Sequence, residues 1–158
     1  MVRFAEEKDL PRVNEIRRLV NDLHVNGRPD LFKPGFCPEM QERVYEMWRS
    51  ADSDVIVAER DGTICGMAAV EYLNKPESPY SKARKFYHVI EFGVDEACRR
   101  QGVGRELMDF IRADAKGRGF SRIELDMWTF NEAALKFYEA VGFQTFRRLM
   151  EWDLTGKA

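Results

Sequence analysis

The stretch that decides the fold of this chain is Arg99-Arg100-Gln101-Gly102-Val103-Gly104. It follows a strand-like run at residues 88–94 and precedes an amphipathic pattern that predicts a helix from Val103. Glycines between a strand and a helix N-terminus let backbone N–H groups approach an anion closely, and the helix dipole adds roughly half a positive charge there. The two arginines can clamp phosphate oxygens. The stretch therefore predicts a cradle for a pyrophosphate group.

Two common phosphate-binding motifs do not fit this stretch. A P-loop needs a Lys-Ser/Thr pair after its last glycine, where this chain has Arg105-Glu106. A dinucleotide-binding fingerprint needs a third glycine in the region that Met108 and its neighbours occupy. That fingerprint also belongs on the first strand of its unit, whereas this stretch lies two-thirds along the chain.

The composition is that of one soluble globular domain spanning residues 1–158. Hydrophobic residues make up 44% and charged residues 33%, which is ordinary for this class. The net charge of −2 argues against nucleic acid or an anionic membrane as a general partner. The sequence shows no apolar run long enough to cross a membrane and no signal peptide, so we expect a cytoplasmic protein.

The cysteines are an odd, scattered set at positions 37, 65 and 98. This pattern is typical of reduced thiols in a cytoplasmic protein rather than of a disulfide framework. With two histidines and no pair of cysteines at metal-binding spacing, the sequence predicts no metal site.

Hydrophobic periodicity and turn residues predict a mixed α+β fold around one central sheet. Asp9 is expected to cap the first helix, Asp61-Gly62 to form a hairpin turn, and Gly142 to end the last helix. Strands are expected at residues 2–5, 55–59, 64–72, 86–94, 121–128 and 143–154, and helices from residues 10, 40, 103 and 131.

Two motifs resemble those of the GCN5-related N-acetyltransferase (GNAT) family. Arg99-x-x-Gly102-x-Gly104 matches the family's acetyl-CoA signature. The segment 131–143 matches its Asn-x-x-Ala-x-x-x-Tyr-x-x-x-Gly-Phe pattern. The resemblance covers nearly the whole chain and is specific from residue 86 to 150. It implies a mostly antiparallel sheet, flanked by helices and splayed between its fourth and fifth strands.

In this family the pantetheine arm of acetyl-CoA lies in the splayed gap and bonds to exposed backbone like an added strand. Gly93 is a sensible place for the bulge that opens this gap. Asn131 can cap its helix and also contact the cofactor, and the small Ala134 leaves room for a ligand beside Tyr138. The resemblance implies these cofactor-binding residues: Phe92, Gly93, Val94, Arg99, Arg100, Gln101, Gly102, Val103, Gly104, Asn131, Ala134 and Tyr138.

The implied chemistry is direct attack of a neutral amine on the thioester, without a covalent enzyme intermediate. By resemblance, Tyr138 protonates the leaving thiolate, although a tyrosine at helical spacing also suits a core position. His88 falls where family members place a catalytic Glu or His. Glu91 is a second candidate base, acting through water, if a bulge turns it to the face of His88. Many members use no side-chain base.

Acceptor specificity is expected in the loops at residues 24–38 and 74–85. Four nearby residues could bind a cationic amine by charge and ring face, namely Glu71, Tyr72, Glu77 and Tyr80. Trp128 and Phe130 belong either to the pocket or to the core. We expect a primary amine acceptor, with a small molecule or amino acid slightly favoured over a peptide. A non-catalytic acyl-CoA-binding module and an O-acetyltransferase are the alternatives. Homodimers are common in the family, but no sequence feature fixes this.

Overall fold

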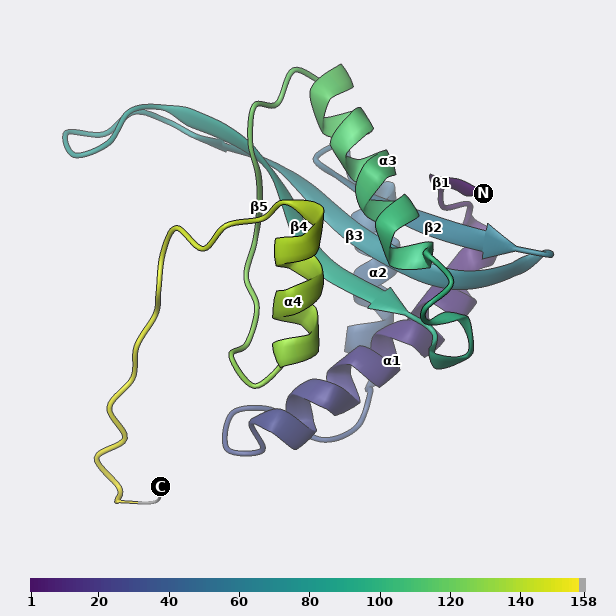
Figure 1. The fold of residues 1–158 in the computed structure, drawn as a ribbon, viewed down its shortest axis with the longest axis horizontal. Coiled ribbons are helices and arrows are strands. Elements are labelled where there is room, and N and C mark those ends of the chain that lie inside the picture. The colour runs from purple at the N-terminus through teal and green to yellow at the C-terminus, as the bar shows by residue number, and fades with distance from the viewer. Residues whose placement is uncertain (157–158) are drawn as a thin grey trace. The chain divides into compact units, whose positions relative to one another are not determined.

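The computed structural model describes residues 1–156 of the chain and divides it into two compact units (Figure 1). The first unit is Met1–Asp126, and the second begins at Met127. Whether the whole chain acts as one domain stays a prediction. Among residues 1–156, no helix is both long enough and apolar enough to cross a bilayer.

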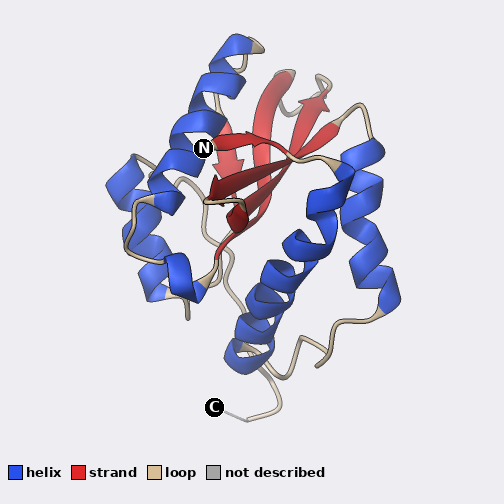
Figure 2. Cartoon of the chain, turned by 90° about the vertical axis from the view of Figure 1, so that its right-hand side faces the viewer, coloured by secondary structure: helices blue, strands red, loops and turns tan. Residues whose placement is uncertain are grey.

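A five-stranded sheet forms the centre of the first unit, and its strands follow one another in chain order (Figures 1 and 2). All neighbouring strands run antiparallel except β4 and β5, which are parallel. This confirms the expected mixed α+β fold. The strands are β1 (Val2–Phe4), β2 (Ser53–Arg60), β3 (Thr63–Lys75), β4 (Arg84–Val94) and β5 (Ile123–Leu125).

Helices cover both faces of this sheet. The helices α1 (Leu10–Gly27) and α2 (Pro38–Arg49) lie on one face, and α3 (Val103–Gly117) lies on the other. A β-carbon at Gly93 would come within 2.9 Å of the Cγ2 atoms of Ile16 and Val20, so the absence of a side chain there lets α1 approach β4.

The β2–β3 turn forms as expected, because Asp61 and Gly62 both adopt positive φ angles, 48° and 77°, typical of a tight hairpin. The first helix begins as expected, directly after Asp9. However, the Asp9 carboxylate does not cap that helix. It accepts a hydrogen bond from the Glu6 backbone and pairs with Arg3 at 2.6 Å. An arginine from β1 therefore replaces the expected cap interaction.

The two halves of β4 differ in their pairing. Residues Tyr87, His88 and Val89 pair with β5, whereas residues 91–94 pair with β3 and with no residue of β5. The expected splay between the fourth and fifth strands is thus confirmed. The expected bulge at Gly93 is wrong, because Gly93 pairs in regular register with Met67. The register shifts instead at Ile90, which lies opposite no residue of β3.

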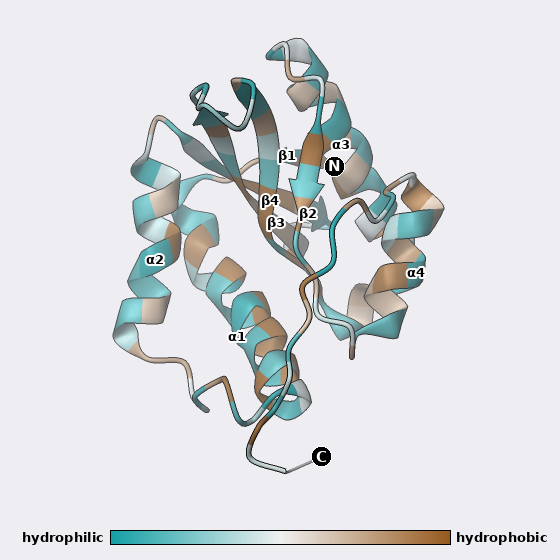
Figure 3. Cartoon of the chain, turned by 90° about the vertical axis from the view of Figure 1, so that its left-hand side faces the viewer, coloured by the Kyte–Doolittle hydropathy of each residue, from teal (hydrophilic) through white to brown (hydrophobic). Residues whose placement is uncertain are grey.

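The second unit contains one helix, α4 (Glu132–Val141), followed by an extended segment. Asn131 accepts a hydrogen bond from Ala134 N, and Gly142 ends the helix at φ 110°, as expected. The strand expected at residues 143–154 does not form. Both hydrophobic and hydrophilic residues occur along this segment (Figure 3), but a strand also needs a hydrogen-bonding partner, and the described sheet ends at β5.

Candidate functional site

The loop between β4 and α3 has the backbone shape of an anion-binding site. Arg100 has φ 62° and Gly102 has φ 81°, so two residues in left-handed conformation precede the first turn of α3. Arg99, Arg100, Gln101 and Gly102 are exposed, and Val103 is buried beneath them. The backbone N–H groups at the start of α3 therefore face solvent beside two guanidinium groups, which is the arrangement that binds phosphate.

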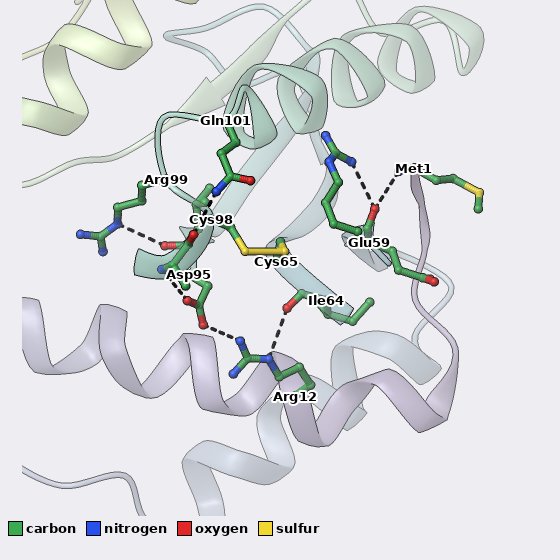
Figure 4. Close-up of a disulfide and its surroundings, with 12 residues drawn as sticks. Met1, Arg12, Glu59, Ile64, Cys65, Asp95, Cys98, Arg99 and Gln101 are labelled. Carbon is green, nitrogen blue, oxygen red and sulfur yellow. Dashed lines mark hydrogen bonds and ion pairs between the residues drawn. A yellow bond between two sulfur atoms is a disulfide. The ribbon is translucent and has the colours of Figure 1, made fainter. Parts of the chain in front are cut away.

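This loop is anchored to the first helix and to β3 (Figure 4). The Asp95 carboxylate forms a short ion pair with Arg12 of α1 and accepts a hydrogen bond from Ala97 N at 2.8 Å. The Ala97 hydrogen bond and the Arg12 ion pair together lower the pKa of Asp95. Asp95 N donates to the carbonyl of Cys65 at 2.8 Å. The start of the loop is therefore bonded to α1, to β3 and to its own backbone at Ala97.

A disulfide joins Cys65 of β3 to Cys98 in the same loop (Figure 4). The Cα atoms lie 5.7 Å apart, within the usual range for a bridge. The expectation that all three cysteines are reduced is therefore wrong for this pair, while Cys37 is free and exposed. The two partners lie 33 residues apart in sequence, and only the fold brings them together.

His88 lies among carboxylates on the α1–α2 face of the sheet. Its Nδ1 atom is 3.4 Å from Oε2 of Glu71, its cross-strand neighbour, and its Nε2 atom is 3.7 Å from Oδ2 of Asp126. Both contacts are long, so they do not fix the imidazole rigidly. The His88 side chain is 21% exposed and remains accessible to a small ligand.

Glu91 lies on the same face as His88, because the shift at Ile90 places Glu91 opposite Ala69 and His88 opposite Glu71. The condition for Glu91 to join His88 is therefore met. However, Arg17 of α1 donates hydrogen bonds from Nε and Nη2 to the two carboxylate oxygens of Glu91, at 2.6 and 2.8 Å. The Arg17 side chain is only 6% exposed. This forked pair holds the carboxylate in place and competes with any proton transfer to it.

A cavity of about 160 Å³ opens between α2 and the end of β3. Glu46, Asp52 and Glu71 supply three carboxylates to its lining, and Arg43 supplies one guanidinium. Arg43 lies 3.9 Å from Glu71. Glu71 therefore connects this acidic cavity with His88.

Of the other residues expected to bind the acceptor, Tyr72 lines the same cavity as Glu71, whereas Glu77 and Tyr80 do not. The hydroxyl of Tyr72 donates to Asp54 at 2.6 Å, and its ring stacks on Phe120, so its ring belongs to the α3 face. Glu77 and Tyr80 are exposed in the β3–β4 loop. In the loop at residues 24–38, His24 stacks on Phe32 with ring centroids 5.4 Å apart.

The expected residues of the second unit lie on and before α4. Burial raises the pKa of Tyr138 to about 12. The Asn131 cap uses its Oδ1 atom, which leaves its Nδ2 group as a donor, and Ala134 is half-buried one turn before Tyr138. Trp128 and Phe130 stack on each other with centroids 6.2 Å apart.

Arg12 and Arg17 were missed by the sequence reasoning. Their partners, Asp95 and Glu91, lie 83 and 74 residues away, so no local spacing points to them. Arg17 lies four residues after Val13 on the buried side of α1, and an arginine on that side needs a partner, which is the one local signal that the sequence offered.

Comparison with known proteins identifies the family. The model of the Acetyltransferase (GNAT) family matches residues 16–143. A crystal structure of a tetramutant of the BH1408 protein from Bacillus halodurans superimposes with a TM-score of 0.92 and 27% identity, covering 98% of this chain and 99% of that one. A complex of the aminoglycoside N-acetyltransferase AAC(6')-Iy with CoA shares the fold, with a TM-score of 0.76 at 15% identity over 98% of this chain and 94% of that one.

Curated relatives match over shorter stretches. The N-alpha-acetyltransferase RimI of Mycobacterium tuberculosis is 33% identical over 99 residues, which are 60% of this chain and 54% of that protein. The L-ornithine N5-acetyltransferase NATA1 of Arabidopsis thaliana is 30% identical over 83 residues, 52% of this chain and 36% of that protein. The chain thus spans about half or less of the length of these relatives.

Proposed function

Because the chain belongs to the acetyltransferase (GNAT) family, we propose that it transfers an acetyl group from acetyl-CoA to a primary amine. One observation carries the proposal. The half of β4 that lacks a partner on the β5 side, residues 90–94, runs directly into the loop at the N-terminus of α3. An exposed strand edge followed by an anion-binding loop fits a ligand with an amide-containing arm and a pyrophosphate.

The donor would be held mainly by backbone. The edge of β4 at Phe92, Gly93 and Val94, beyond its pairing with β5, offers backbone N–H and C=O groups to the pantetheine amides. The loop from Arg99 to Gly104 offers N–H groups and two guanidinium groups to the pyrophosphate. By the family pattern, Asn131 and Ala134 complete the set. The donor supplies an electrophilic carbonyl carbon, which backbone N–H groups near Val94 can polarise.

His88 is the base that the geometry favours. It would accept the proton that the acceptor nitrogen loses as the N–C bond forms and the C–S bond breaks. Glu71 and Asp126 would stabilise the resulting positive charge. Glu91 is less suited to this task, because its two oxygens are already engaged by Arg17. We therefore assign Glu91 a structural role.

Tyr138 would donate a hydrogen bond to the departing sulfur. Its pKa of about 12 exceeds that of an ordinary thiol by about 3.5 units, so complete proton transfer to the thiolate is uphill by about 5 kcal/mol. Stabilisation by a shared proton, with the final proton coming from solvent, is the better description. Tyr138 also keeps its proton at any pH at which the protein is ordinarily assayed.

The acceptor would carry a positive charge. Three carboxylates and one guanidinium line the cavity between α2 and β3, and this net negative charge favours an ammonium group. The volume of about 160 Å³ suits an amino acid or the end of one side chain. Relatives act on ornithine and on protein N-termini, so both acceptor classes belong in the test.

The test is turnover of acetyl-CoA with a panel of amines, amino acids, polyamines, aminoglycosides and short peptides. Acetyl gain is read by mass, because thiol dyes would also report protein cysteines. We expect transfer to at least one cationic amine. Tight acetyl-CoA binding without transfer to any acceptor would favour the alternative of a non-catalytic acyl-CoA-binding module.

Two variants separate the assigned roles. We expect His88→Gln to lower kcat by about 100-fold at neutral pH and to recover part of that loss at high pH, where the amine is already neutral. We expect Tyr138→Phe to keep acetyl-CoA affinity and to lower kcat by about 10- to 100-fold. The conservative variant Glu139→Gln, at an exposed position on the same helix, is the matched control. Unchanged turnover in either test variant would remove that residue from the mechanism.

A further inference from the structure

The strands β3 and β4 continue as a two-stranded ribbon beyond the ends of their neighbours (Figure 1). β2 pairs with β3 no farther than Glu71, and β5 pairs with β4 only from Tyr87 onward. Beyond that point, residues 73–75 pair with residues 84–86, and no other described strand flanks them. The sheet therefore has a narrow extension that begins directly beside the acidic cavity.

One face of this ribbon continues the face that carries His88. Along it the register sets three cross-strand pairs, namely Glu71 with His88, Leu73 with Phe86, and Lys75 with Arg84. Because side chains alternate along a strand, these pairs share one face, and the rings of Phe86 and His88 meet edge to face at 6.2 Å. Glu71 and Leu73 also line the acidic cavity. A row of side chains therefore leads from the cavity and His88 to two cations.

These two cations lie against the buried ring of Phe86. Nζ of Lys75 is 5.5 Å and Cζ of Arg84 is 4.5 Å from the ring centroid. Arg84 gives two of its five N–H donors to Glu124 and keeps three. Lys75 is exposed and forms no ion pair within residues 1–156. The pair therefore has donors left for a further carboxylate.

The spacing along β4 determines which acceptors reach both ends of this row. Four residues separate Arg84 from His88, which is about 13 Å of strand. A free amino acid is too short to place its ammonium group beside His88 and its carboxylate on the two cations. An extended peptide covers about 10–14 Å in three or four residues. A peptide with its N-terminal nitrogen at His88 would therefore bring its third or fourth side chain to Lys75 and Arg84.

The chemistry of the proposed base also favours an N-terminal amine. Such an amine has a pKa of about 8, whereas a lysine side chain has a pKa of about 10.4. At neutral pH a much larger fraction of the N-terminal amine is already neutral. A histidine with an ordinary pKa of about 6.5 is then a sufficient proton acceptor.

We propose that the acceptor is a polypeptide N-terminus with an acidic side chain at its third or fourth residue. The proposal rests on the acetyl transfer proposed above. The terminal nitrogen bonds to the acetyl carbon, the C–S bond breaks, and His88 takes the proton. Lys75 and Arg84 bind the acidic side chain of the acceptor. The carboxylates around the cavity and the two cations are thus complementary to the two ends of this segment.

The first test compares kcat/KM for short synthetic peptides, with acetyl gain read by mass. Each peptide of an alanine and serine series carries a single Glu at the second, third, fourth or sixth position, and Gln at the same position is its matched control. We expect Glu at the third or fourth position to raise kcat/KM by about 5- to 10-fold over Gln, mainly through KM. Acetylation of small amines alone, or equal kcat/KM with Glu and Gln, overturns this proposal and leaves acetyl transfer standing.

Variants of the ribbon identify the residue that reads the acidic side chain. Lys75→Gln should remove most of the preference for Glu, and Lys75→Glu should reverse it in favour of a peptide with Lys at that position. Lys82→Gln, at an exposed lysine in the β3–β4 loop, is the matched control and should keep the parent preference. A preference for Glu that survives Lys75→Glu contradicts the assignment.

Peptide affinity separates this proposal from the proposed catalysis. The same peptides, labelled at the C-terminus, are titrated with the protein in the presence of CoA, and binding is read by fluorescence anisotropy. Tighter binding of the Glu peptide that is lost in Lys75→Glu would support the recognition even without turnover. An absence of turnover with every acceptor would count against acetyl transfer, whereas equal affinities for the Glu and Gln peptides would overturn the present proposal.

Discussion

The two halves of β4 differ in how their backbone is paired and in how tightly their polar side chains are held. In the first half, residues 87–89 are paired on both sides, yet the polar contacts of His88 are long, at 3.4 and 3.7 Å. The second half, which contains Glu91, is paired on one side, yet Arg17 holds Glu91 at 2.6 and 2.8 Å. Rigid backbone thus accompanies a loosely held side chain, and open backbone accompanies a tightly held one. A proton acceptor needs the first arrangement, and a backbone ligand site needs the second.

The largest expected effect comes from breaking the Glu91 pair. Glu91→Leu leaves the Arg17 guanidinium buried without its partner, so we expect the free energy of unfolding to fall by about 3–5 kcal/mol. Denaturation in urea measures this. His88→Gln, on the same strand and face, is the control and should change stability by about 0.5 kcal/mol or less. Equal losses in the two variants would contradict the contrast between the halves.

The disulfide that holds the end of β4 comes next. Cys65→Ser should lower the free energy of unfolding by about 2–4 kcal/mol under oxidising conditions, because the bridge closes a long loop. Reductant should lower the stability of the parent chain by a similar amount and leave Cys65→Ser unchanged. Cys37→Ser removes the exposed thiol and serves as the control. A parent chain indifferent to reductant would show that the bridge does not form in solution.

Close packing behind the open half of β4 predicts a smaller effect. Gly93→Ala places a methyl group within 2.9 Å of Ile16 and Val20, whose branched side chains cannot easily turn away. We expect a loss of about 1–3 kcal/mol in thermal or urea denaturation. Gly117→Ala, where the space is open, should instead gain up to about 1 kcal/mol. A neutral Gly93→Ala would mean that α1 does not pack this closely.

The smallest expected effect concerns pH. The native pKa of Asp95 is lowered by the Ala97 N–H and by Arg12, so the ionised carboxylate stabilises the fold above its unfolded value of about 3.9. This contribution is lost as pH falls below that value towards the native pKa. Asp95→Asn should cost about 1 kcal/mol at neutral pH and flatten the decline of Tm in acid. Asp109→Asn, at an exposed carboxylate on α3, should keep the parent slope.

Local features were predictable from the sequence because their causes are local. Asp61-Gly62 needs two positive φ angles, and Gly142 needs one, so these residues indicate their own conformations. The Arg99–Gly104 loop was also predictable, because its glycines and the start of the amphipathic helix pattern lie within a few residues of one another. Periodicity was sufficient to locate the helices and the first four strands.

Features that depend on distant partners were not predictable. The register shift occurs at Ile90, which has no turn-forming character, while the glycine three residues later pairs regularly. The Cys65–Cys98 bridge and the pairing of Glu91 with Arg17 join residues that meet only in the folded chain. The sequence predicted a strand at residues 143–154, but composition does not supply the neighbouring edge that a strand requires.

The ion pair between Arg12 and Asp95 has a thermodynamic consequence. It joins the first turn of α1, a helix of the His88 face, to the loop that leads into α3. If a ligand bound on the His88 face or at the loop changes the strength of this pair, the two sites are coupled. Linkage then requires reciprocity, so that each ligand changes the affinity for the other by the same factor.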